Sequence, residues 1–343
     1  MRVNAESGRV LHDTRRYRPD IDGLRALAVL AVMGFHLFPA LAHGGFVGVD
    51  IFFVISGFLI SSVLLDDLAA GRPRFARFYS HRVRRIFPSL VVVLLASWAA
   101  GWVWLLPHDF AQLGKHIGGG AAFIANLLYW GEAGYFDRES VAKPLLHLWS
   151  LGVEEQFYLL WPLLLLIIWK ARRFRIGIFA LLFFGSFALS LVTVQHDATA
   201  AFYSPIDRFW ELMAGGALAY AARDVRADAW WRTQTLVRHL CSVIGTTLIA
   251  IAIVRFDKAA VFPGWKVLLP VVGAALIIAA GPQAWLNRHV YSRRAAVWVG
   301  LISYPLYLWH WPLLSFSRLI NGDPSTPIRI AIAAASIVLA ALT

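Results

Sequence analysis

Cysteine and charged residues are both scarce in this chain of 343 residues. The single cysteine, Cys241, excludes a disulfide bond within the chain. Only 15% of the residues are Asp, Glu, Lys or Arg, whereas 59% are hydrophobic. A soluble protein of this size needs a more polar surface, so the excess of apolar side chains must face lipid. The composition therefore excludes a soluble globular protein and indicates an integral membrane protein.

Acidic residues are the scarcer of the two charged classes, and the formal net charge is +12. Such an excess of basic residues can indicate a nucleic-acid partner. Here, however, the basic residues lie in short loops between apolar runs, where membrane topology and anionic lipid headgroups explain them. We therefore expect membrane lipids, and no nucleic acid, among the partners.

Long apolar runs recur along the whole sequence. A transmembrane helix needs about 20 predominantly apolar residues. We expect an all-α, polytopic transmembrane helical bundle of about ten spans, at residues 22–40, 46–66, 86–107, 147–169, 176–194, 208–222, 240–254, 267–281, 296–316 and 328–343. Residues 1–20 are expected to form a cytoplasmic segment, and residues 21–343 the transmembrane domain. The last run stops at Thr343 without a polar flank, so we expect the natural chain to continue.

Lys and Arg alternate between the two sets of loops. If the N-terminus is inside, the inner segments hold most of the basic residues. The outer segments then hold only Lys115, Arg138, Lys143, Arg208, Arg255, Lys258, Lys266 and Arg318. Because positive residues favour the cytoplasmic side, the sequence predicts a cytoplasmic N-terminus.

Several ionisable residues fall inside the expected spans. Each costs about 2.5–3.5 kcal/mol at the centre of a membrane helix, so each is a candidate for function. They are Arg25, His36, Asp50, Glu154, Glu155, Glu211 and His310. Some of them could instead only pair to hold helices together.

Arg25 and His36 share the first span and are eleven residues apart. This is close to three helical turns, so both side chains are expected on one face, about 16 Å apart along the axis. Counted from the short turn after the first span, Asp50 lies at a depth similar to that of His36. The fourth expected span places Glu154 and Glu155 at a depth in the membrane comparable to that of His36. Adjacent helical residues point about 100° apart, so at most one of the two glutamates need face the site. Asp50 or one of these glutamates is predicted to orient His36 for proton abstraction.

Two further segments carry polar groups in apolar surroundings. Residues 72–85 contain six arginines, whose guanidinium groups are suited to bidentate binding of phosphate. Positive-inside topology with anionic lipid explains the same cluster without a ligand. Residues 303–312 combine two prolines with Tyr304, Tyr307 and His310. This pattern predicts a broken helix that lines a cavity, and an interfacial aromatic belt is the alternative.

The chain resembles the acyltransferase-3 family of membrane O-acyltransferases, which O-acetylate lipopolysaccharide, peptidoglycan and other cell-surface glycans. Five segments carry the resemblance over nearly the whole chain: residues 17–36, 44–60, 78–88, 147–158 and 303–312. The resemblance implies essential roles for Arg25 with His36 and for an Arg-x-x-Arg pair, Arg82 and Arg85. It also implies acetyl-coenzyme A as the donor, without a metal, and a location in the bacterial inner membrane. Some members carry a C-terminal SGNH hydrolase-like domain, and nothing of that kind is visible in residues 1–343.

The resulting hypothesis is a cytoplasmic acyl-coenzyme A whose phosphates bind Arg82, Arg85 and Arg25, and whose thioester reaches His36. His36 would act as the general base on a hydroxyl of a cell-surface glycan or lipid-linked sugar, or would briefly carry the acyl group. The predicted catalytic set is His36, Asp50, Glu154 and Glu155, and the predicted substrate-binding set is Trp149, Tyr304, Tyr307 and His310. The alternatives are a secondary transporter or flippase for a lipid-linked sugar, and a membrane scaffold, which leaves the buried charges unexplained.

Overall fold

The computed structural model describes residues 17–133, 143–257 and 262–343, and this part of the chain contains helices and no strands. The helices are α1 (Pro19–Leu37), α2 (Gly48–Ala69), α3 (Phe75–Trp104), α4 (Pro107–Ala121), α5 (Ala125–Glu132), α6 (Leu148–Lys170), α7 (Arg175–His196), α8 (Ala198–Tyr203), α9 (Pro205–Ala221), α10 (Val225–Thr233), α11 (Thr235–Arg255), α12 (Leu268–Ala280), α13 (Arg294–Leu301), α14 (Ser303–Asn321) and α15 (Thr326–Leu342). The all-α prediction is confirmed for these residues.

Each apolar range expected to span the membrane falls on a helix, and 296–316 falls on the pair α13 and α14. Within the described residues, five segments are long and apolar enough to cross a bilayer: Gly45–Ala69, Phe75–Trp104, Leu148–Lys170, Arg175–His196 and Thr235–Arg255. The segments Gly264–Ala280 and Thr326–Leu342 are apolar but shorter. The chain is therefore a polytopic helical membrane protein, while the figure of about ten spans and the orientation of the N-terminus stay predictions.

Helix α2 lies at the centre of the bundle and packs on α1, α6, α9 and α12. Its closest partner is α9, and two glycines permit this approach. A Cβ at Gly57 would lie 1.8 Å from the backbone oxygen of Leu212, and a Cβ at Gly215 would lie 2.1 Å from that of Val54. Small residues at a helix interface allow backbones to approach in this way in membrane proteins. This packing brings the buried polar residues of α2 and α9 together.

The prediction that residues 303–312 form a broken helix is wrong, because α14 runs through all of them, Pro312 included. The break in the expected span 296–316 lies just before them, at Ile302, between α13 and α14. Helix α14 packs along α3 on one side and α15 on the other. The interruption places Ser303 and the following tyrosines beside the first turns of α3, which carry Arg82 and Arg85.

Candidate active site

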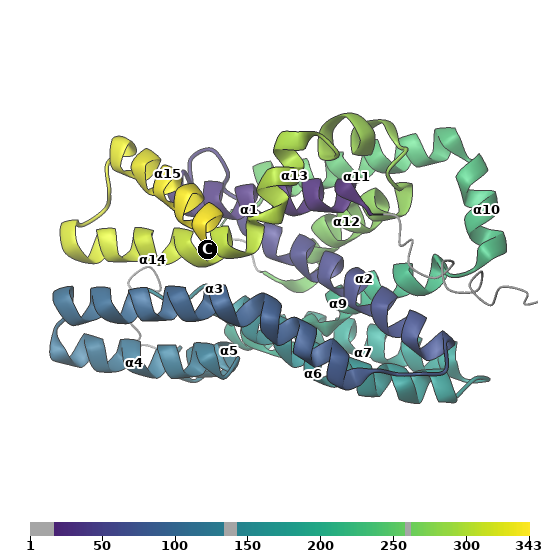
Figure 1. Ribbon diagram of the computed structural model, residues 1–343, viewed down its shortest axis with the longest axis horizontal. Helices are drawn as coiled ribbons and strands as arrows, with labels where there is room; N and C mark the ends of the chain where they lie inside the picture. Colours follow the sequence, from purple (N-terminus) through teal and green to yellow (C-terminus); the bar gives the residue numbers. More distant parts are fainter. Residues whose placement is uncertain (1–16, 134–142, 258–261) are drawn as a thin grey trace, which may run out of the picture.

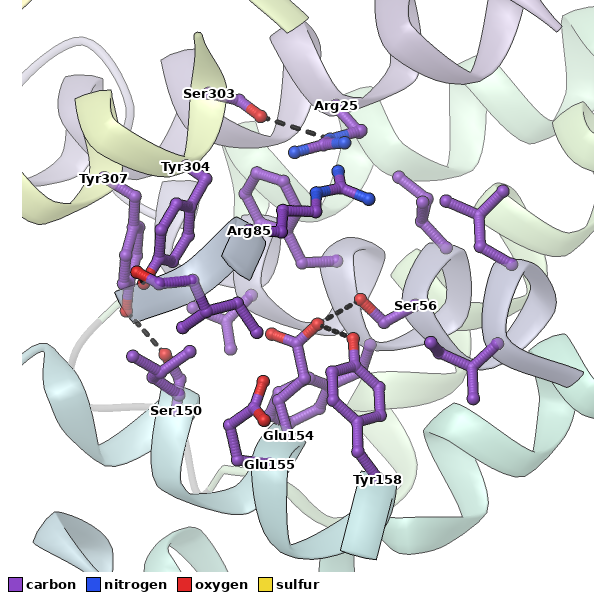
Figure 2. A pocket seen from close by; sticks show the side chains of 18 of the residues that line it. Arg25, Ser56, Arg85, Ser150, Glu154, Glu155, Tyr158, Ser303, Tyr304 and Tyr307 are labelled. Atoms are coloured by element: carbon purple, nitrogen blue, oxygen red, sulfur yellow. Dashed lines mark hydrogen bonds between the residues drawn. The ribbon is translucent and has the colours of Figure 1, made fainter. Parts of the chain in front are cut away.

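A cavity of about 840 Å³ lies among α1, α2, α3, α6 and α14. Its charged and hydroxyl-bearing lining residues are Arg25, Ser56, Arg82, Arg85, Ser150, Glu154, Glu155, Tyr158, Ser303, Tyr304 and Tyr307. Figure 2 shows these side chains, apart from Arg82, converging on one space from the surrounding helices. We refer to this space as the arginine cavity.

Three arginines, Arg25, Arg82 and Arg85, line the arginine cavity together with Glu154 and Glu155. Arg25 donates from Nε to Oγ of Ser303 at 3.2 Å, and the guanidinium of Arg82 lies 5.2 Å from the centre of the Tyr158 ring. Arg85 is exposed, and its guanidinium lies next to that of Arg25 (Figure 2). Across the described ranges, none of the three forms an ion pair with Asp or Glu. Neighbouring guanidinium groups repel each other, so this arrangement favours a bound anion.

The two glutamates of α6 line the arginine cavity and not the space around His36. Glu154 accepts hydrogen bonds from the hydroxyl groups of Ser56 and Tyr158 (Figure 2). Glu155 has one buried carboxylate oxygen, Oε1, without a hydrogen-bond partner among the described residues. The expected place of Glu154 or Glu155 beside His36 is wrong, because α6 carries both side chains toward α2 and α3.

A second cavity, of about 1090 Å³, contains His36, and we refer to it as the histidine cavity. Its lining is rich in aromatic rings: Phe35, Phe46, Trp149, Phe202, Tyr203, Phe262, Tyr307 and Trp311. Val49 and Tyr307 line both cavities. The two spaces are thus neighbours, and these two side chains form part of the wall between them.

His36 is held between aromatic side chains of α14. Its Nδ1 lies 3.0 Å from Nε2 of His310, and the two imidazole rings are stacked with their centroids 5.2 Å apart. The ring of Trp311 lies 4.5 Å from that of His36. His310 is fully buried, and its Nδ1 lies 2.6 Å from the backbone oxygen of Tyr307. Helix α14 therefore fixes the position of the imidazole of His36.

Asp50 lines the histidine cavity, as its predicted depth implies, but it is bound to an arginine there. Arg208 donates to Asp50 and also, from Nε at 2.5 Å, to Glu211. All three side chains are almost completely buried. Arg208, which the sequence places in an outer segment, lies in the first turn of α9 and bonds to Asp50 of α2. The spacing Arg208-x-x-Glu211 could have indicated this ion pair, because residues three apart are neighbours on a helix.

Three of the four predicted substrate-binding residues, Trp149, Tyr304 and Tyr307, line the cavities, whereas His310 lines neither of them. Tyr304 lines the arginine cavity, and its hydroxyl donates to the backbone oxygen of Ile86 at 3.1 Å. Tyr307 donates to the backbone oxygen of His147 at 2.9 Å. Trp149 lines the histidine cavity, with the guanidinium of Arg208 5.7 Å from its ring centre. The hydroxyl groups of these tyrosines therefore brace α14 against α3 and against the start of α6.

Sequence reasoning missed the neutral polar residues of the arginine cavity. Ser56 and Tyr158 hold Glu154, Ser303 holds Arg25, and Ser150 lies 2.6 Å from the hydroxyl of Tyr307. Serines in membrane helices carry no sequence signal of their own, because they also bond to the backbone of the preceding turn. Across residues 17–133, 143–257 and 262–343, no cluster of His, Cys, Asp and Glu is placed to hold a metal ion.

In its described residues the chain is a helical membrane protein in which a cavity lined by arginines adjoins a cavity that contains His36. The acyltransferase domain family Acyl_transf_3 matches residues 18–343, and the chain is a member of this family. It is 30% identical to the peptidoglycan O-acetyltransferase OatA of Listeria monocytogenes over 324 residues, which cover 89% of this chain and 50% of OatA.

A second relative is YrhL of Bacillus subtilis, whose name marks it as a candidate peptidoglycan O-acetyltransferase. It is 32% identical over 329 residues, which cover 90% of this chain and 51% of YrhL. The chain thus spans about half the length of these curated relatives. No solved structure matches it.

Proposed function

We propose that the chain is a membrane-bound O-acyltransferase that moves an acetyl group from acetyl-coenzyme A to a hydroxyl of a cell-surface glycan. The observation that carries the proposal is the pair of adjoining cavities, one with three arginines free of ion pairs and one with a fixed histidine. The family and the named activity of OatA support acyl transfer, and OatA makes peptidoglycan the first acceptor to test.

The donor binds through its phosphate groups in the arginine cavity. Arg82 and Arg85 lie one helical turn apart on α3, and Arg25 reaches the same space from α1. Each guanidinium group can donate two parallel hydrogen bonds to the oxygens of a phosphate, so the three arginines can hold a diphosphate. The negative charge of the diphosphate offsets the repulsion between the guanidinium groups. The pantetheine arm then extends toward Tyr307, beyond which the histidine cavity opens.

His36 acts as the general base on the acceptor hydroxyl. The imidazole removes the hydroxyl proton while the oxygen forms a bond to the acetyl carbonyl carbon. Collapse of the tetrahedral intermediate breaks the carbon–sulfur bond, and the imidazolium returns the proton to the departing thiolate. The products are the acetyl ester and coenzyme A with a free thiol, and His36 returns to its neutral form.

The donor is taken from the cytoplasm and the acceptor from the opposite side. The positive-inside distribution of Lys and Arg supports this orientation, because the arginine cavity lies near the arginine-rich start of α3. His36 is eleven residues from Arg25 along α1, about 16 Å. This separation matches a donor and an acceptor that arrive from different sides of the membrane.

Two neighbouring arginines of α3 give a matched test of the donor site. Arg85 lines the arginine cavity, whereas the adjacent, exposed Arg84 does not. We expect Arg85→Gln to weaken coenzyme A binding about tenfold or more, because a charge-assisted hydrogen bond is lost. Arg84→Gln should change the affinity less than about twofold.

Isothermal titration of the detergent-solubilised protein with coenzyme A measures both affinities. Equal affinities of the two variants would contradict the assignment of the arginine cavity to the donor. A wild-type protein that does not bind coenzyme A would contradict the proposed donor altogether and would favour a transporter for a lipid-linked sugar.

A further inference from the structure

The hydrogen-bond chain from His36 through His310 to the backbone of α14 has a defined direction. His310 Nδ1 lies 2.6 Å from the carbonyl oxygen of Tyr307. A carbonyl oxygen only accepts hydrogen bonds, so Nδ1 of His310 must carry a proton. His310 has no exposed surface, and burial disfavours its doubly protonated, charged form. Its Nε2 is therefore unprotonated and accepts.

The same logic fixes the tautomer of His36. Its Nδ1 lies 3.0 Å from Nε2 of His310, and an accepting Nε2 requires a donating Nδ1. A neutral imidazole with its proton on Nδ1 has its lone pair on Nε2. In the other tautomer, two unprotonated nitrogens would face each other at this distance.

The carboxylates expected to orient His36 either bond to other residues or line the other cavity. Asp50 accepts from Arg208, Glu154 accepts from Ser56 and Tyr158, and Glu155 lines the arginine cavity. The partner that α14 supplies to His36 is thus an imidazole, and this imidazole is itself oriented by the backbone.

We propose that His310 is the positioning residue of His36, which holds its proton on Nδ1 and so presents Nε2 as the base. This inference rests on the proposed function and replaces the sequence-based role of His310 in substrate binding. During transfer the proton from the acceptor hydroxyl adds to Nε2 of His36, while the bond from Nδ1 to His310 persists. His310 holds the base and does not exchange a proton in this scheme.

Two amide substitutions separate the two hydrogen bonds of His310. Gln places its amide group near the position of Nε2, where the oxygen can accept from His36. Asn places its amide group near the position of Nδ1, where the nitrogen can donate to the carbonyl of Tyr307 but the side chain is too short to reach His36. A role in positioning His36 and a role in bracing α14 therefore predict opposite orders of activity.

We expect His310→Asn to lower kcat for acetyl transfer by about 100-fold or more, because the tautomer of His36 is no longer fixed. His310→Gln should recover at least about tenfold of that loss. The KM for acetyl-coenzyme A should stay within about twofold of the wild-type value in both variants, because the arginine cavity is unchanged.

The measurement is steady-state transfer of labelled acetyl to a peptidoglycan acceptor, with coenzyme A binding and thermal unfolding recorded for each variant as a check of folding. A His310→Asn variant more active than His310→Gln, or a loss seen in KM and not in kcat, would overturn the inference. If Asn does not fold, a Gln variant that binds coenzyme A but is inactive overturns it equally. Wild-type protein that binds coenzyme A but transfers nothing would instead refute the proposed function.

Discussion

One arginine and two carboxylates form a buried cluster beside the histidine cavity. Arg208 bonds to Asp50 of α2 and to Glu211 of α9, and all three side chains are almost fully shielded from solvent. Phe53 and Trp149 flank the guanidinium, with ring centres 5.5 and 5.7 Å away. A buried ion pair is costly to desolvate, but removal of one partner leaves an uncompensated charge. We therefore assign this cluster to the stability of the α2–α9 contact.

The two arginine–aspartate pairs of α2 differ mainly in burial, and this difference predicts their contributions to stability. We expect Arg208→Gln to lower the free energy of unfolding by about 3–5 kcal/mol, because two buried carboxylates lose their counter-charge. Arg223→Gln, which removes the partly exposed pair with Asp66, should cost less than about 1 kcal/mol. Thermal unfolding of the two variants in the same detergent compares them. Similar unfolding temperatures would contradict the structural role of Arg208.

At the scale of elements, Glu132, the last residue of α5, connects α5 to α4 and to the segment just before α6. Neither α4 nor α5 is among the helices that are long and apolar enough to cross the membrane. Glu132 accepts from Lys115 of α4 at 2.7 Å and from Lys143, just before α6, at 3.1 Å, and it lies 2.9 Å from Nε2 of His116. Burial alone would raise the pKa of Glu132, but the hydrogen bonds from Lys115, His116 and Lys143 outweigh it and lower the pKa to about 2. The charged form of Glu132 therefore stabilises the folded state.

The low pKa of Glu132 predicts how the stability depends on pH. The contribution is fully present above the ordinary glutamate pKa of 4.5 and is lost as the pH falls from there toward about 2. We expect Glu132→Gln to be less stable than wild type at pH 7, with the difference shrinking toward pH 3. Thermal unfolding temperatures of both proteins between pH 7 and pH 3 check this. A difference in unfolding temperature that is constant over this range would contradict the stabilising role of charged Glu132.

The positions of the helices could be predicted from the sequence, but their junctions could not. Apolar runs of adequate length mark α2, α3, α6, α7 and α11, because the bilayer sets the length of a span. The interruption at Ile302 lies between two apolar segments and carries neither Gly nor Pro at that position. Next to it, a Cβ at Gly300 would lie 1.9 Å from the backbone oxygen of Asp22, so α13 packs directly on α1. A sequence pattern does not show such a contact.

At the scale of the whole molecule, the residues that the sequence indicates as functional are distributed between two cavities. Intramembrane charges drew attention to Arg25, His36 and Glu154, and all three line a cavity. Which residues meet could not be predicted, because depth along a helix does not give its rotation about its axis. For this reason Asp50 and the glutamates were paired with His36, whereas the structure pairs it with His310.

The central claim is that His36 is the general base in the transfer of an acetyl group from a donor held by the arginines. The most direct measurement follows labelled acetyl-coenzyme A supplied to the cytoplasmic face of membrane vesicles, with wild type compared with His36→Ala. The account predicts label in peptidoglycan on the opposite side for wild type and at least a 100-fold slower transfer for His36→Ala, with equal coenzyme A binding by both. Undiminished transfer by His36→Ala would contradict it.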